Sequence, residues 1–92
     1  MHKVSFTTHA AQRMQQRLGI NISQGQSVDI TSNFVKTFGY IDTRNDLIEH
    51  WVNKDRRQPV VLAINAYTGF VVTVMTSGPI VDAAYRRLDT MH

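Results

Sequence analysis

The sequence contains no cysteine among its 92 residues, so disulfide bridges and thiolate zinc sites are excluded. Although 42% of the residues are hydrophobic, no apolar run approaches the length of a membrane span, and the N-terminal residues lack the apolar core of a signal peptide. We therefore expect a soluble, cytoplasmic protein with no membrane segment.

Acidic residues are scarce, and the first Asp or Glu in the chain is Asp29. Ten Lys and Arg against seven Asp and Glu give a net charge of +3, which weakly favours an anionic partner. The chain has no internal repeat, low-complexity tract or flexible linker. We expect one domain over residues 1–92.

Hydrophobic patterning predicts an α+β domain in which N-terminal helices pack on an antiparallel β-sheet, with a C-terminal helix. Residues 3–6 are expected to form a short edge strand, followed by a helix that Thr7 or Thr8 caps and Gly19 ends. Residues 23–38 are expected to form a second helix, because Ile30, Phe34 and Phe38 recur at i, i+4 and i+8.

The second half of the chain is typical of three strands and a helix. Alternating or continuous apolar residues predict strands over 47–53, 60–66 and 70–76, joined by a charged loop at 54–58 and a short turn at 67–69. A helix is expected to begin at Pro79, with an apolar row formed by Ile80, Ala84, Leu88 and Met91 and widened by Val81 and Tyr85.

His9, Arg13 and Arg17 lie four residues apart in the first predicted helix and form a slightly slanting row beside its apolar stripe. A neutral imidazole next to a guanidinium suits attack on a phosphodiester, since one group moves a proton while the other holds the phosphate. The alternative is an ordinary solvated helix flank. Two arginines at i, i+4 repel each other, and no acidic residue in this helix offsets them, which favours an external anion.

Further candidates lie on the predicted strands and in the charged loop. His50 is either a second catalytic group or a packed strand residue, and Thr73 and Thr76 interrupt an otherwise apolar strand. Arg56 and Arg57 either extend a phosphate-binding track or are merely solvated. The histidines have no metal-ligand spacing and no cofactor motif occurs, so neither a metal nor a cofactor is expected.

The motif T-x-H-A-x-x-R-M-x-x-R-x-G-I, followed at a distance by V-V-T-V-M-T, resembles the small bacterial and phage domains related to RelE-type and BrnT-like toxins. These belong with the barnase, EndoU and colicin ribonucleases, and the resemblance covers residues 4–77. It implies a metal-independent ribonuclease in which His9 is the general acid or base and Arg13 binds the phosphate. Arg17 would support Arg13, and Thr73 or Thr76 would add a polar group from a strand.

The resulting hypothesis is a small endoribonuclease that cleaves RNA by attack of the 2′-hydroxyl, with His9 and His50 exchanging protons. The alternative is a catalytically inactive phage or plasmid accessory protein that binds a host protein or nucleic acid. RNA is the expected partner, and an antitoxin or a host protein is the other candidate. Leu47, Trp51 and Tyr85 offer apolar surface that also suggests a homodimer.

Overall fold

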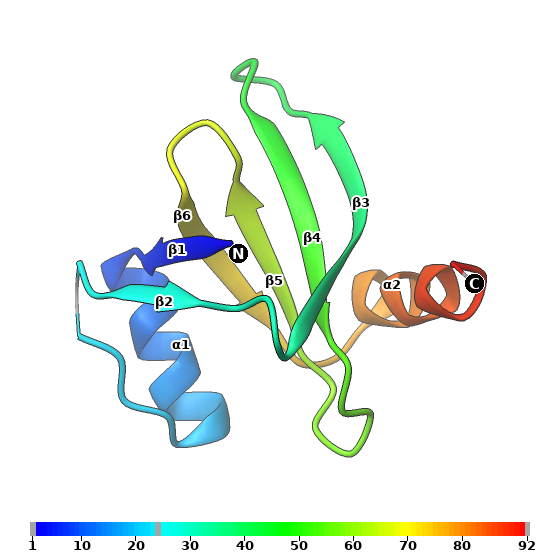
Figure 1. The fold of residues 1–92 in the computed structure, drawn as a ribbon, viewed down its shortest axis with the longest axis horizontal. Coiled ribbons are helices and arrows are strands. Elements are labelled where there is room, and N and C mark those ends of the chain that lie inside the picture. The colour runs from blue at the N-terminus through cyan, green and yellow to red at the C-terminus, as the bar shows by residue number, and fades with distance from the viewer. Residues whose placement is uncertain (1, 24, 92) are drawn as a thin grey trace.

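The computed structural model describes residues 2–23 and 25–91 and confirms the α+β class (Figure 1). The elements in chain order are β1 (Lys3–Phe6), α1 (Thr8–Leu18), β2 (Ser27–Asp29), β3 (Phe34–Ile41), β4 (Leu47–Asn53), β5 (Val61–Asn65), β6 (Phe70–Met75) and α2 (Pro79–Asp89). None of the helices in the described part of the chain is both long and apolar enough to cross a membrane.

The six strands form one sheet in the order β2-β1-β6-β5-β4-β3. The sheet is mixed, because β1 runs parallel to β6 while every other neighbouring pair is antiparallel. The expected purely antiparallel sheet is therefore wrong in this one pairing. The prediction of an edge strand over residues 3–6 is also wrong, because β1 lies between β2 and β6.

The sheet is strongly curled. Strands β2 and β3 are its two edges, yet only residues 30–33 separate them in the chain. We call residues 30–33 the joint between β2 and β3. Backbone hydrogen bonds hold it in place, from Ile30 N to the His2 carbonyl (3.1 Å) and from Lys54 N to the Asn33 carbonyl (2.8 Å). The ring of His2 also lies 4.5 Å from the ring of Trp51 on β4. In Figure 1, β1 and β2 accordingly cross in front of the other strands.

The helix expected over residues 23–38 is wrong: this segment forms β2, a turn and β3. Its first residues are poor helix formers, and its β-branched residues suit a strand. A β-bulge between Lys36 and Phe38 places Phe34 against the main core and Phe38 on the other face of the sheet, so their i, i+4 spacing does not mark one helix face. A bulge inserts one residue and breaks the two-residue alternation by which a strand is recognised.

The main core lies inside the curl of the sheet. Val4, Phe6, Leu62 and Ile64 are almost fully buried there. Helix α1 adds the buried Ala10 and Met14, with partly buried Ala11 and Leu18 beside them. This confirms the apolar stripe predicted for the first helix. Thr7 caps α1 by accepting a hydrogen bond from Ala10 N (3.1 Å), and Gly19 ends it in the left-handed conformation (φ 68°).

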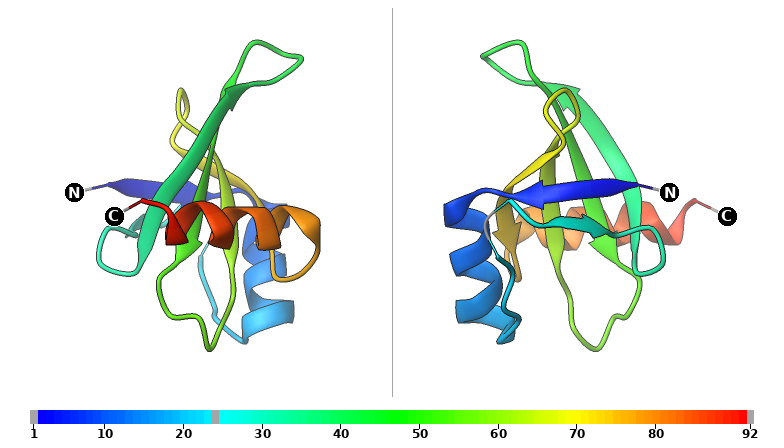
Figure 2. Two further views of the ribbon diagram at one scale, coloured as in Figure 1. Left: turned by 90° about the vertical axis from the view of Figure 1, so that its right-hand side faces the viewer. Right: turned by 60° about the vertical axis from the view of Figure 1, so that its left-hand side comes forward.

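Helix α2 packs on the opposite, outer face of the sheet. It begins at Pro79, as predicted, and buries Val81 and Ala84 against Val52 and Val61. Two members of the predicted apolar row lie at its exposed side: Ile80 and Met91 each keep 49% of their surface accessible. Figure 2 (left) shows α2 crossing the sheet at one end of the strands, so the described chain places no helix over the outer face towards the other end.

The aromatic side chains that suggested a homodimer are largely accommodated within the chain. Trp51 packs against the main core and its indole N–H donates to Glu49 (3.1 Å). The Tyr85 hydroxyl accepts from Val60 N (3.3 Å) and donates to the Asn53 carbonyl (2.7 Å). The surface on which the dimer prediction rested is therefore smaller than the sequence suggests.

We expect Tyr85→Phe to destabilise the fold by about 1–3 kcal/mol, because two partly buried backbone groups lose their hydrogen-bond partner. Urea unfolding measures the change. Tyr67→Phe is the matched control, since Tyr67 is 64% exposed, and it should change stability by less than about 0.5 kcal/mol. Equal stability of the two variants would contradict the role assigned to the Tyr85 hydroxyl.

Candidate functional site

The candidate site lies where β1 stops covering the edge of β6. Strand β1 pairs with β6 only at Phe70 and Val71, and Thr7 N donates the next hydrogen bond to the Val71 carbonyl (3.1 Å). The chain then turns into α1, which packs beside the remainder of β6. Within residues 2–23 and 25–91, no strand pairs with this outer edge of β6 beyond Val71.

A cavity of about 250 Å³ separates α1 from this edge. Its lining comprises His9, Arg13 and Arg17 from α1 and Thr73, Val74, Met75, Thr76 and Ser77 from β6 and the residues after it. The guanidinium of Arg17 donates to the Thr76 hydroxyl (3.2 Å). The structure thus brings the predicted histidine and arginine row together with both predicted threonines.

The cavity is suited to an anion. None of its lining residues is acidic, and no carboxylate of the described residues forms an ion pair with Arg13 or Arg17. The first turn of α1, which contains His9, has no acidic residue, so the positive end of the helix dipole is not offset there. A phosphate would meet two guanidinium groups, an imidazole and hydroxyl donors.

His50 does not line this cavity. It lies on β4 opposite Ala63, which in turn lies opposite Thr73 on β6. Because neighbouring strands are about 4.8 Å apart, His50 is about 10 Å from Thr73 along the same face of the sheet. Burial, and to a smaller extent the positive charge of Arg87, lower the pKa of His50, so its neutral form is favoured at neutral pH.

Arg56 and Arg57 also lie outside the cavity. Arg57 binds Asp55 within the loop between β4 and β5, at 3.1 Å. Arg56 pairs with Asp89 at the end of α2, and its guanidinium lies 5.4 Å from the centre of the Tyr85 ring. Both side chains therefore have carboxylate partners within the chain, and neither lines the cavity at His9.

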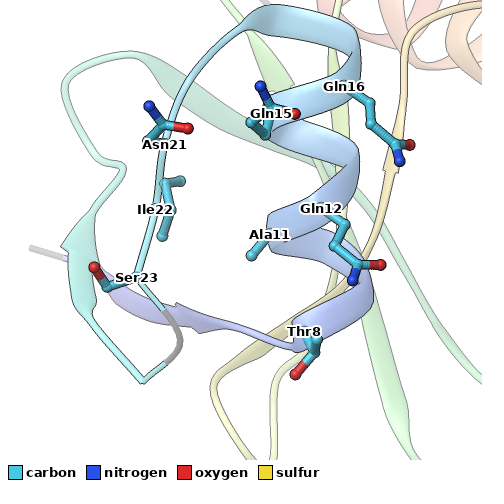
Figure 3. Close-up of a pocket in the computed structure, with 8 residues that line it drawn as sticks. All are labelled: Thr8, Ala11, Gln12, Gln15, Gln16, Asn21, Ile22 and Ser23. Carbon is cyan, nitrogen blue, oxygen red and sulfur yellow. The ribbon is translucent and has the colours of Figure 1, made fainter.

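A larger cavity, of about 510 Å³, lies on the other flank of α1 (Figure 3). It is lined by Thr8, Ala11, Gln12, Gln15, Gln16, Asn21, Ile22 and Ser23. These side chains offer amides and hydroxyls but no group that titrates near neutral pH. Despite its smaller volume, the cavity at His9 is therefore the better candidate for acid-base chemistry.

Phe38 and Tyr40 were not among the predicted site residues, and Arg87 was expected only as a polar-face residue of the last helix, either solvated or part of a phosphate-binding track; the structure gathers all three around His50. The Phe38 and Tyr40 rings are 6.0 Å and 5.6 Å from the His50 ring, and the Arg87 guanidinium lies over Phe38. Phe38 was assigned to a helix, and no local pattern links Arg87 to residues that precede it by about 37 to 49 positions. Only the strand register could have revealed this cluster.

Comparison of the chain with protein-family models, with curated proteins and with solved structures gives no match. The resemblance to RelE-like ribonucleases therefore stays a prediction from the sequence.

We expect the stability of the protein to fall as the pH drops below about 6.5, in part through His50. The unfolded chain protonates this histidine before the folded chain does, so protons favour unfolding. The melting temperatures of the native protein and of His50→Gln, measured between about pH 7.5 and about pH 5, test this. The native protein should lose more stability on acidification than the variant. Parallel curves would contradict the assignment.

Proposed function

We propose that the protein is a metal-independent endoribonuclease that cleaves RNA by attack of a 2′-hydroxyl on the adjacent phosphate. The observation that carries the proposal is the shared cavity of His9, Arg13 and Arg17 with the hydroxyl groups at the end of β6. The resemblance of the first helix to RelE-like ribonucleases supports the same chemistry. No cofactor is required for this reaction.

Arg13 and Arg17 are proposed to bind the phosphate. Guanidinium groups pair with phosphate oxygens through two parallel hydrogen bonds, and their charge stabilises the dianionic phosphorane that forms during attack. Arg13 is half-buried whereas Arg17 is exposed and already donates to Thr76. Arg13 is therefore the stronger candidate for contact with the reacting phosphate, and Arg17 for contact at the rim.

His9 is proposed to be the general base, because it is the one imidazole among the lining residues. It takes the proton from the 2′-hydroxyl as the 2′-oxygen bonds to phosphorus. The bond from phosphorus to the 5′-oxygen breaks, and this oxygen takes a proton from water. The products are a 2′,3′-cyclic phosphate and a 5′-hydroxyl. Thr73 and Thr76 would donate hydrogen bonds to the non-bridging oxygens.

The alternative is a module that binds RNA or another polyanion without cleaving it. The presence of a single imidazole in the cavity favours this alternative, since His50 lies two strands away from Thr73. Efficient cleavage of this kind gains from both a base and an acid. The same arginines would then hold phosphate groups with no proton transfer.

Cleavage of a mixed RNA pool in the presence of EDTA tests the enzymatic proposal. His9→Ala should lower the rate by about two to four orders of magnitude. The melting temperature should hardly change, because His9 is exposed. Gln12→Ala, an exposed position of the same helix that lines the other cavity, should retain the rate. Intact RNA with the native protein would contradict the enzymatic proposal.

Binding of a non-cleavable RNA tests the anion site independently of cleavage. Arg13→Ala should weaken binding and lower the slope of log affinity against log salt concentration by about 1. Arg57→Ala removes the same charge from a side chain that is paired with Asp55, and it should have a much smaller effect. Equal losses in the two variants would indicate attraction by net charge and would contradict a specific phosphate site.

A further inference from the structure

Three aromatic rings and one guanidinium gather on the outer face of β3 and β4. The rings of Phe38 and Tyr40 are stacked at an interplanar angle of 29° with centres 5.7 Å apart, and the rings of Tyr40 and His50 meet in a T-shaped contact at 5.6 Å. The Arg87 guanidinium carbon, reaching over from α2, lies 4.2 Å from the centre of the Phe38 ring. We call Phe38, Tyr40 and Arg87 the aromatic cluster.

The β-bulge in β3 places this cluster on the outer face. Before the bulge, Lys36 pairs with Trp51, which packs against the main core on the inner face. After it, Phe38 pairs with His50, which shares its face with Val52 and α2. In a regular strand, residues two apart lie on the same face, so Phe38 would have faced inward beside Lys36. The irregularity therefore brings aromatic rings to a surface.

The cluster remains accessible. Tyr40 keeps 39% of its surface exposed, whereas Phe38 is partly buried beneath the Arg87 guanidinium of α2. In the same part of the chain, no carboxylate lies within ion-pair distance of Arg87. An exposed ring beside an unpaired guanidinium can receive a planar group that also carries negative charge.

The outer face of the sheet connects the cluster to Thr73, which lines the cavity at His9. Phe38, His50, Ala63 and Thr73 lie opposite one another on four consecutive strands. Since each step between strands is about 4.8 Å, the row is about 14 Å long and ends at a residue that lines the cavity. A single-stranded nucleic acid with a phosphate in the cavity can reach the cluster within a few nucleotides.

We propose that the aromatic cluster is a nucleobase-stacking subsite for single-stranded RNA, with Tyr40 as its exposed platform and Arg87 as its cation. The inference rests on the proposed RNA function of the His9 cavity and adds the substrate class: an unpaired strand and not a duplex. Unpaired bases stack on aromatic side chains and on guanidinium planes, whereas the bases of a duplex are hidden.

Two RNA probes of about six nucleotides test the subsite. Both carry 2′-O-methyl groups that block cleavage; one is a uridine oligomer and the other has the same backbone without bases. Tyr40→Ala should weaken binding of the uridine oligomer by about five- to hundredfold and leave binding of the abasic strand unchanged. Tyr40→Phe, which retains the ring, should bind both probes like the native protein.

Arg13→Ala should weaken binding of both probes, because it acts on the backbone phosphate. If Arg13→Ala has this effect while Tyr40→Ala binds the uridine oligomer normally, the subsite is overturned and the phosphate site stands. An equal loss of both probes in Tyr40→Ala also overturns it. A native protein that binds neither probe overturns both proposals. Trp51 fluorescence reports folding from the opposite face, and Tyr40→Leu replaces Tyr40→Ala if the latter fails to fold.

Discussion

The short joint between β2 and β3 is the constraint on which the rest of the structure depends. A flat six-stranded sheet would separate its edge strands by about 24 Å, but the chain from Asp29 to Phe34 can span at most about 18 Å. The joint is shorter still, because Phe34 N bonds to the Ile30 carbonyl at 2.9 Å. The sheet must therefore curl until its edges approach. Burial of Ile30 in the main core (3% exposed) stabilises this closure.

Curling also determines where α1 lies. Strand β1 connects β6 to the edge strand β2, which approaches the opposite edge β3. It pairs with β6 at only two residue pairs. The rest of the β6 edge is left without a strand, and α1 covers it with Ala10 and Met14 turned into the core. One flank of α1 then faces the end of β6 across a narrow space. The cavity at His9 is a consequence of sheet closure, since a longer β1 would have filled it with backbone.

Local patterns were sufficient for the elements whose apolar residues follow one regular period between clear start and stop signals. The apolar stripe of α1, the strands on either side of residues 54–58 and the Pro79 start of α2 all follow from periodicity and capping. The segment from residue 23 to 38 could not be assigned in this way, because its bulge breaks the alternation by which a strand is recognised and its pairing partners lie in β1 and β4. The parallel pairing of β1 with β6, which are more than 60 residues apart, is equally invisible to local patterns.

The same distinction separates the two parts of the candidate site. The row of His9, Arg13 and Arg17 could be recognised from spacing alone, because one helix holds it, whereas the aromatic cluster depends on strand register and on the approach of α2. The two parts have in common arginine side chains that form no ion pair with a carboxylate of the described residues. Arg56 and Arg57 are each neutralised by a carboxylate, but in the described structure Arg13, Arg17 and Arg87 are not. Under the proposed function, one extended polyanion running from the cavity at His9 to the aromatic cluster would offset Arg13 and Arg17 at one end and Arg87 at the other.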